Sequence, residues 1–237
     1  LDIAIAGCGP GGLAAALLLK RDGHRVTVFE RFETPRPIGS GLMLQPTGLA
    51  VLDRLGLADL ALQKGARIDR LVGQAGMAGP VVLDVRYAAL GRPAAFGIGI
   101  HRASLFALLH DAVTAAGVPI ATGRTVASSV LDGVKRHLHF ADGGVAGPFD
   151  LVVDALGTRT PLAPPTGRSL AYGAIWASLD WPDGASFDGA ALEQRYRRAS
   201  TMVGVLPIGT PSNASRPQVA FFWSLRADRL AAWRTAG

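Results

Sequence analysis

Residues 2–31 read DIAIAGCGPGGLAAALLLKRDGHRVTVFER, and this stretch decides the fold. An apolar run leads into the glycine pattern Gly7-x-Gly9-x-x-Gly12, and an Ala/Leu-rich segment follows. A second apolar run then ends on Glu30. This order is typical of a dinucleotide-binding strand–turn–helix–strand unit, in which an acidic residue after the second strand accepts hydrogen bonds from a ribose.

The glycines have separate roles in such a unit. Gly7 would allow the tight turn, Gly9 would let a pyrophosphate approach the backbone, and Gly12 would let the helix pack closely on the sheet. The helix N-terminus, at Pro10 and Gly11, would offer free N–H groups and the positive end of its dipole to the phosphates. The alternative is a glycine-rich turn between a buried strand and a buried helix. It accounts for the glycines but leaves the acidic residue unexplained.

Composition limits the class of protein. The chain of 237 residues has room for one large domain or two modest ones, and its 49% hydrophobic and 18% charged content is typical of a globular protein. The formal net charge is +6 and the pI about 10.2. The basic residues are spread singly, apart from Arg195, Arg197 and Arg198. We therefore expect no nucleic-acid binding, but a positive field that attracts anionic cofactors and substrates.

The single cysteine, Cys8, excludes an intrachain disulfide and indicates a reducing, cytoplasmic location. It could be a reactive thiol within the glycine turn, but the favoured interpretation is a small buried side chain. The apolar segment 13–19 is too short to cross a bilayer, and no basic region precedes it. We therefore expect neither a membrane span nor a signal peptide.

The rest of the chain divides into two kinds of pattern. Segments 46–56 and 101–117 have apolar residues at helical spacing and end on glycine, while Asp132-Gly133 between alternating runs predicts a hairpin. Beyond residue 171 come three strand-like runs with aromatic residues and no further βα alternation.

We predict an α/β fold in which a Rossmann-like cofactor-binding domain is joined to a second, mainly antiparallel β-sheet domain that binds the substrate. The first domain is discontinuous and takes residues 1–70 and 97–165. The second takes residues 71–96 and 166–237.

Four segments together resemble a known family. They are GCGPGG with the Glu30-Arg31 pair, IGSGLMLQPTGLAVLDRLGL (38–57), IGIHRASLFALL (98–109) and DLVVDALG (150–157). The family is the FAD-dependent aromatic hydroxylases of the p-hydroxybenzoate and salicylate hydroxylase type, and the resemblance covers essentially the whole chain. It implies that NADPH or NADH reduces bound FAD, and that O2 forms a flavin C4a-hydroperoxide whose terminal oxygen passes to an aromatic small molecule.

The resemblance also implies roles for individual residues. Arg102 would approach the FAD phosphates, the loop with Ser40 and Gly41 would pass beside the flavin ring, and the strand of Val126 would meet the adenine. An Arg in the first turn of a helix opposes the helix dipole, so a phosphate partner gives Arg102 a reason to be there, whereas the alternative is an exposed Arg. The predicted cofactor-binding residues are Gly7, Gly9, Pro10, Gly11, Gly12, Glu30, Arg31, Arg36, Ser40, Gly41, Arg102, Val126 and Gly157.

Two departures from the family pattern are visible. After the strand at 150–155 the family has an Asp-Gly turn followed by a Ser and an Arg, but here Leu156 and Ala163 take the Asp and Arg positions, while Gly157 and the hydroxyl of Thr160 remain. This change puts the site for the nicotinamide donor in doubt. The chain also contains no Gly-Asp dipeptide, which the family uses to bind the ribityl chain, so we expect a C-terminally incomplete sequence.

Substrate contacts are expected from the second sheet, because a pocket for a planar ring is apolar with a few polar groups. No catalytic side chain is named, since the flavin supplies the chemistry. His137 and His139 share one face of a strand but lack further ligands, so no metal site is predicted. The oligomeric state stays open. The substrate candidates are Tyr172, Trp176, Met202, Phe222 and Trp223, with ordinary packing as the alternative for each.

Two other functions remain open from the sequence. One is a flavoprotein reductase or dehydrogenase of related fold that inserts no oxygen. The other is a non-catalytic FAD-domain remnant, which the altered Asp-Gly turn and the missing Gly-Asp pair keep under consideration.

Overall fold

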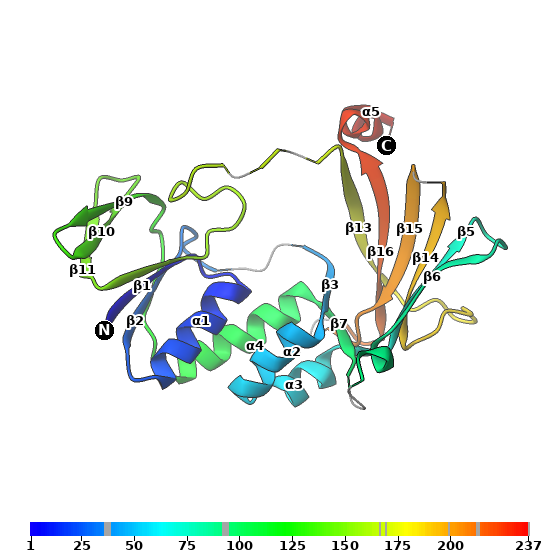
Figure 1. The fold of residues 1–237 in the computed structure, drawn as a ribbon, viewed down its shortest axis with the longest axis horizontal. Coiled ribbons are helices and arrows are strands. Elements are labelled where there is room, and N and C mark those ends of the chain that lie inside the picture. Colours follow the sequence, from blue (N-terminus) through cyan, green and yellow to red (C-terminus); the bar gives the residue numbers. More distant parts are fainter. Residues whose placement is uncertain are drawn as a thin grey trace. The chain divides into compact units, whose positions relative to one another are not determined.

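The computed structural model describes residues 1–35, 39–91, 95–165, 167–168, 170–198, 200–211 and 214–236 (Figure 1). The chain forms two compact units, each of which is built from two segments of the sequence. The first unit comprises Leu1–Pro37 and Leu105–Gly167, and the second comprises Ile38–Ser104 and Arg168–Gly237.

The first unit is built on a parallel sheet with the strand order β12-β1-β2-β8. Its central strand β1 is buried along Ile3 to Ala6, as expected for a strand covered on both faces. Helix α1 connects β1 to β2 and packs on them (Figure 1). The elements of this sheet and its helices are β1 (Asp2–Ala6), α1 (Pro10–Arg21), β2 (Arg25–Phe29), α4 (Arg102–Ala115, which begins in the second unit), β8 (Ile120–Ala121) and β12 (Leu151–Asp154).

Local sequence explains both ends of α1. Pro10 stands at the first helical position, where its missing N–H costs nothing, and Lys20 and Arg21 lie in the last turn, where the dipole favours cations. Gly23 then takes a φ of +82°, a left-handed conformation that ends the helix. The buried residues Leu13 and Leu17 face the sheet side of the helix.

A second, antiparallel sheet of three strands completes the first unit. Its strands are β9 (Val126–Asp132), β10 (Lys135–Phe140) and β11 (Val145–Phe149), in the order β11-β10-β9. The hairpin predicted at Asp132-Gly133 is confirmed, since β9 and β10 pair antiparallel around it. Between the two sheets the rings of Phe29 and Phe140 lie 5.4 Å apart in a buried apolar cluster.

The second unit contains two sheets. The smaller one has the order β3-β7-β4 and is antiparallel. The larger one has the order β13-β16-β15-β14-β5-β6 and is antiparallel except for the parallel pair β14 and β5 (Figure 1). The strands are β3 (Gly41–Leu44), β4 (Ala66–Ile68), β5 (Arg70–Ala75), β6 (Val81–Arg86), β7 (Gly97–His101), β13 (Tyr172–Asp180), β14 (Ala191–Arg197), β15 (Thr201–Pro207) and β16 (Gln218–Arg226).

Short helices accompany these sheets. In α2 the predicted apolar face is confirmed, since Leu52 and Leu55 are buried, and Gly56 ends the helix with a φ of +73°. The helical elements of the second unit are α2 (Pro46–Leu55), α3 (Ala58–Lys64), the 3-10 turns η1 (Tyr87–Leu90) and η2 (Ala227–Arg229), and α5 (Leu230–Ala236).

The register of the six-stranded sheet sorts its side chains onto two faces, because residues directly opposite one another share a face. One cross-strand row runs through Trp176, Phe222, Gly204, Gln194 and Gly73, and we name its side of the sheet the Phe222 face. A neighbouring row defines the opposite side, the Trp223 face, through Ile175, Trp223, Val203, Arg195 and Gln74.

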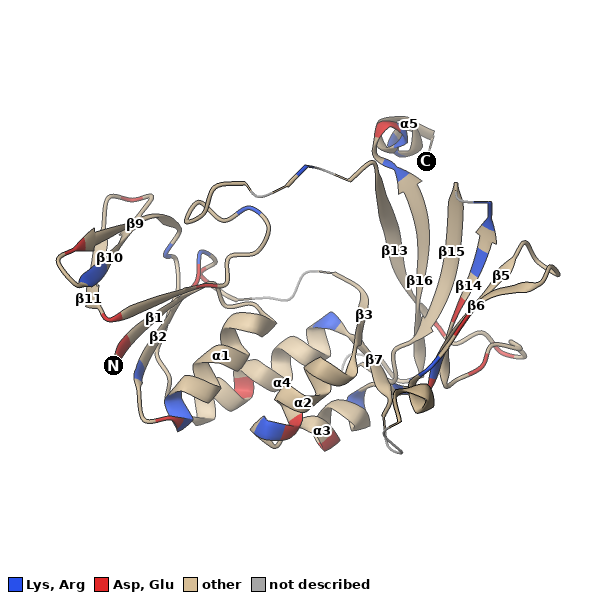
Figure 2. Ribbon diagram, in the orientation of Figure 1, with Lys and Arg blue, Asp and Glu red and all other residues tan. Residues whose placement is uncertain are grey.

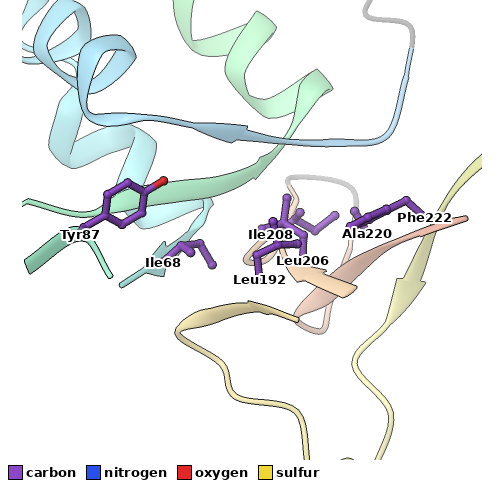
Figure 3. Packing of buried hydrophobic residues seen from close by; sticks show 7 residues of the cluster. All are labelled: Ile68, Tyr87, Leu192, Leu206, Ile208, Ala220 and Phe222. Atoms are coloured by element: carbon purple, nitrogen blue, oxygen red, sulfur yellow. The ribbon is translucent and has the colours of Figure 1, made fainter. Parts of the chain in front are cut away.

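A buried cluster lies on the Phe222 face. Its side chains come from the sheet and from the segments that border it (Figure 3). Met43 and Leu71 pack against its edge. The cluster consists of Ile68, Tyr87, Leu192, Leu206, Ile208, Ala220 and Phe222.

The predicted α/β class, a parallel sheet plus a mainly antiparallel one, is confirmed. Sequence analysis assigned residues 38–70 and 97–104 to the cofactor-binding domain, whereas they lie in the second compact unit because β3, β4 and β7 pair with one another. A compact unit need not coincide with a cofactor-binding domain, so the predicted boundaries of the functional domains stay a prediction.

Adjacent glycines in α1 give a matched test of packing. A β-carbon on Gly12 would overlap the carbonyl oxygen of Gly7, whereas one on Gly11 would meet nothing within 4 Å. We expect Gly12→Ala to lower the free energy of unfolding by about 3 kcal/mol, because backbone blocks the new methyl group. Gly11→Ala should leave it unchanged or raise it by up to about 1 kcal/mol. Urea unfolding measures both, and equal stabilities would contradict the packing described here.

Candidate functional site

The candidate site in the first unit lies where its parallel strands end. Strands β12, β1 and β2 are adjacent and run in the same direction, so their carboxyl ends meet at one edge of the sheet. The glycine loop follows β1 at this edge, Glu30 follows β2, and Asp154 is the last residue of β12. Ligands of open α/β sheets bind in the crevice outside such carboxyl ends.

Two glycines of the loop are required by the packing of the protein itself. Gly7 has a φ of +109°, and a β-carbon there would lie 2.5 Å from the carbonyl oxygen of Ala155. Its N–H donates to the carbonyl oxygen of Phe29 at 2.9 Å, which ties the loop to β2. A β-carbon on Gly12 would lie 2.1 Å from the carbonyl oxygen of Gly7. These two positions set the tight turn and the close approach of α1 to the sheet, as predicted from the sequence.

The other two glycines face open space. A β-carbon on Gly9 or Gly11 would meet no protein atom within 4 Å. Gly9 is the N-cap of α1, no side chain caps it, and the first turn contains no acidic residue. The N-terminal end of the helix is thus free of the side chains that would compete with an anion. This arrangement fits the phosphates of a dinucleotide.

Glu30 is held by the backbone at the same edge. Its Oε2 accepts the N–H of Cys8 at 3.0 Å, and its Oε1 accepts the N–H of Phe32 at 3.0 Å. Its own backbone N–H donates to Ala121, and its carbonyl accepts from Arg124. The Glu30 carboxylate is therefore fixed against the glycine loop. Each of its oxygens keeps a lone pair for a further donor.

The Cys8 side chain is buried, with 3% of its surface exposed. Burial raises the pKa of the Cys8 thiol to about 12, and the nearby Glu30 carboxylate acts in the same direction. A thiol in this state is a small apolar side chain and not a nucleophile.

A groove of about 510 Å³ lies beside the loop in the first unit. Among its lining residues, Asp154 accepts hydrogen bonds from the N–H of Leu156 at 3.0 Å and from the hydroxyl of Thr160. The side chain of Leu156 packs into the apolar cluster around Phe29. The carboxylate in this turn thus belongs to Asp154, two residues before Leu156, the position at which the resemblance expects an Asp. The groove is lined by Gly11, Val153, Asp154, Ala155, Gly157 and Thr160.

Three further predicted cofactor-binding residues are Arg31, Val126 and Arg36. Arg31 is exposed, and its guanidinium lies 4.6 Å from the centre of the Phe32 ring. Val126 is buried in the cluster around Phe29, so only its backbone is available to a ligand. Arg36 lies outside the described residues.

In the second unit, Arg102 lies against the predicted flavin loop. A β-carbon on Gly39, whose φ is +123°, would lie 3.1 Å from Cδ and 3.3 Å from Nη1 of Arg102. The backbone N–H of Arg102 donates to the carbonyl oxygen of Ser40 at 3.0 Å. His101 Nδ1 accepts the N–H of Ala103 at 3.1 Å and so caps the start of α4. Glycine at position 39 thus suits both the positive φ and the close approach of the Arg102 side chain.

The same loop packs onto the Phe222 face. The hydroxyls of Ser40 and Ser178 lie 2.8 Å apart in a hydrogen bond, and a β-carbon on Gly41 would lie 2.5 Å from the β-carbon of Ala220. In the sheet, Ala220 is on the same strand and face as Phe222. The loop predicted to run beside the flavin is thus in contact with the face predicted to hold the substrate.

The register separates the predicted substrate residues. Tyr172, Trp176, Met202 and Phe222 share the Phe222 face, and the rings of Trp176 and Phe222 stack with centres 4.7 Å apart. Trp223 lies on the opposite face, because neighbouring strand residues alternate in direction. Four of the five candidates can thus line one surface, and Trp223 cannot join them.

Sequence reasoning missed several polar residues at these sites. Asp154 ends a strand at the edge that also carries Glu30. Both acids end or follow apolar strand-like runs, so the sequence contained this signal. Ser178, Gln194 and Tyr196 lie on the Phe222 face. Their faces depend on strand register, which the sequence alone does not supply.

Several known proteins are similar to this chain. A family model described as an FAD binding domain matches residues 1–145. The chain is 38% identical over 122 residues to 3-hydroxybenzoate 6-hydroxylase 1 of Aquipseudomonas alcaligenes, covering 49% of this chain and 30% of that protein. It is 33% identical over 165 residues to 3-amino-4-hydroxybenzoate 2-monooxygenase of Streptomyces cremeus, covering 68% and 40%. The matched segments therefore cover less than half the length of these relatives.

Solved structures share the fold. The crystal structure of Klebsiella pneumoniae HpxO complexed with FAD and uric acid superposes with a TM-score of 0.77 at 22% identity, covering 98% of this chain and 60% of that one. At this identity the likeness concerns the fold alone.

Among the residues that the structure describes, no helix combines the length and apolar character needed to cross a membrane. Over the same ranges, no three His, Cys, Asp or Glu side chains are grouped so as to hold a metal ion.

The open space at Gly9 can be filled without disturbing the protein. Its φ of −78° and ψ of 173° suit a β-branched residue, so we expect Gly9→Val to abolish flavin binding and to leave the unfolding midpoint unchanged. Gly173→Val is the matched control, because Gly173 also meets nothing within 4 Å and lies in the other unit. Visible flavin absorbance of the purified variants measures the effect. Unchanged flavin content in Gly9→Val would contradict the site assignment.

The buried thiol of Cys8 predicts a reactivity profile. With a pKa of about 12, only about one thiol in ten thousand is ionised at pH 8, so iodoacetamide should alkylate the native protein very slowly. The rate should rise with pH until about 12, and urea-unfolded protein should react rapidly near pH 8.5, the ordinary range of a thiol. Equal rates for native and unfolded protein at pH 8 would show that Cys8 is an accessible nucleophile.

Proposed function

Because the chain belongs to the FAD binding domain family, we propose that the protein is an FAD-dependent monooxygenase. It hydroxylates an aromatic small molecule with NADPH or NADH as electron donor and O2 as oxygen source. The observation that carries the proposal is the meeting of a fixed carboxylate, Glu30, with two glycines, Gly9 and Gly11, that face open space at the carboxyl edge of a parallel sheet.

The AMP half of FAD would be bound by this edge. The ribose hydroxyls would donate to the lone pairs of the Glu30 carboxylate that the N–H groups of Cys8 and Phe32 leave free. The pyrophosphate would lie over Gly9 and Gly11 at the N-terminal end of α1. The cofactor-binding residues proposed from the sequence, including Arg31, Val126 and Gly157, keep these roles as part of the proposal.

The second unit would serve the flavin and the substrate. Arg102, held over Gly39, offers a guanidinium for a phosphate, and Ser40 and Gly41 pass beside the ring system. When bound, FAD supplies the redox and oxygen-transfer chemistry. The Phe222 face orients the aromatic ring and excludes water through Trp176 and Phe222.

The names of the relatives support this assignment. One relative is named as a hydroxylase of 3-hydroxybenzoate and another as a monooxygenase of 3-amino-4-hydroxybenzoate. Both names describe oxygen insertion into a substituted aromatic ring. The proposed location is the cytoplasm, which agrees with a lone, buried cysteine. The FAD domain is proposed to take residues 1–70 and 97–165 and the substrate domain the remainder.

Substrate-dependent oxygenation tests the proposal. We expect the full-length protein to bind FAD, and an aromatic substrate to accelerate NADPH or NADH oxidation, with labelled O2 appearing in the product by mass spectrometry. Accelerated oxidation without label in the product would indicate a reductase or dehydrogenase. Absence of bound flavin would indicate a non-catalytic remnant and overturn the proposal.

A further inference from the structure

The groove of the first unit lies where the order of the parallel strands reverses. The chain places β2 on one side of β1 and returns to place β12 on its other side, in the order β12-β1-β2-β8. Ligands of open α/β sheets bind at such a point, outside the carboxyl ends of the strands. Asp154 ends β12 there and lines the groove together with Gly11 of α1. The contacts proposed above for FAD leave this acid without a ligand.

The register of the sheet places Asp154 and Glu30 on either side of β1. Asp154 of β12 and Phe29 of β2 both lie opposite Ala6, and Glu30 is the residue after Phe29. Since neighbouring strands are about 4.8 Å apart, the ends of β12 and β2 are separated by about 10 Å. The glycine loop that follows β1 starts between them. Two carboxylates thus flank the proposed phosphate site.

The Asp154 carboxylate is held by its own turn. Its Oδ1 accepts the N–H of Leu156 at 3.0 Å, and its Oδ2 accepts the hydroxyl of Thr160. The Thr160 oxygen in turn accepts the N–H of Leu162 at 3.0 Å, so its single proton is directed at Asp154. Each carboxylate oxygen keeps a lone pair for a further donor.

Among the residues that the structure describes, no cation forms an ion pair with Asp154. Arg159, in the same turn, is exposed and takes part in none of these pairs. Asp154 is exposed as well. Its free lone pairs are therefore open to neutral donors such as the hydroxyls of a ligand.

The groove joins this acceptor to a place for an anion. The charged residues of α1, Lys20 and Arg21, lie in its last turn, and its first turn carries no charge (Figure 2). A phosphate fits the open helix end at Gly11 but is repelled by the Asp154 carboxylate. A hydroxyl next to the phosphate fits Asp154. The groove therefore suits a sugar or sugar alcohol attached to a phosphate.

We propose that Asp154 binds the hydroxyls of the sugar-alcohol chain that joins the pyrophosphate of FAD to the flavin. It would do on this side of the pyrophosphate what Glu30 is proposed to do for the ribose on the adenine side. Thr160 is a positioning residue, because its proton is directed at Asp154. This inference rests on the proposed function and assigns a contact to the flavin half of the cofactor.

Two ligands separate the halves of the cofactor. ADP ends at the pyrophosphate, whereas FAD continues with the sugar-alcohol chain and the flavin. In the full-length protein freed of flavin, Asp154→Asn should weaken FAD binding about tenfold or more and leave the affinity for ADP unchanged. Glu30→Gln should weaken both ligands, because they share the ribose. Isothermal titration calorimetry measures the dissociation constants.

The Asp154→Asn variant keeps the turn, because the amide oxygen still accepts the N–H of Leu156. Thr160→Val should also weaken FAD and spare ADP, and Thr160→Ser should restore the affinity through its hydroxyl. Asp188→Asn is the matched control. Asp188 likewise accepts the N–H of the residue two places on, Ala190, at 2.9 Å, but it lies in the other unit. Its loss should change neither affinity.

Two outcomes would overturn the inference. An equal loss of ADP and FAD affinity in Asp154→Asn would show that Asp154 only holds its turn. Unchanged FAD affinity would also contradict it, and a weakened affinity for NADH alone would assign Asp154 to the electron donor instead. Failure of the unmodified protein to bind FAD would overturn the proposed function itself, so the two failures are distinguishable.

Discussion

The hydrogen bonds between Glu30 and the backbone of Cys8 and Phe32 are the interaction on which the first unit's site depends. They join the end of β2 to the turn after β1 and fix a negative charge beside a helix terminus that lacks side-chain acids of its own. Both donors are backbone groups of the segments that follow β1 and β2, so the protein itself positions the carboxylate. The site is therefore preorganised, which lowers the cost of ordering a cofactor.

Much of the first unit could be predicted because its signals are local. The turn at Gly7 and the helix start at Pro10 each follow from a single residue's backbone preference. The hairpin at Asp132-Gly133 has the same local cause. The position of the acid at the groove was harder. The resemblance expects an Asp at the position of Leu156, but this side chain packs against the apolar cluster, and the carboxylate in this turn is that of Asp154.

The second unit could be predicted only coarsely, because its site depends on register. A shift of one residue exchanges the faces of a strand, so Trp223 and Phe222 point to opposite sides although they are neighbours. For the same reason Gln194 and Arg195, neighbours in the sequence, lie on opposite faces of the sheet. The parallel pair β14 and β5 joins segments far apart in the chain, so no local sequence pattern predicts it.

Glycines show how structural and functional positions differ in a chain that contains 30 of them. At Gly12 and Gly204 the space of the missing side chain is filled by the protein itself, by a carbonyl oxygen in one case and by the Phe222 ring in the other. At Gly9 and Gly11 the space is open, although a side chain would fit. This open space fits a ligand that comes close to the backbone, as the proposed pyrophosphate would. The filled positions shape the two sheets, and the open pair marks the surface where the dinucleotide would bind.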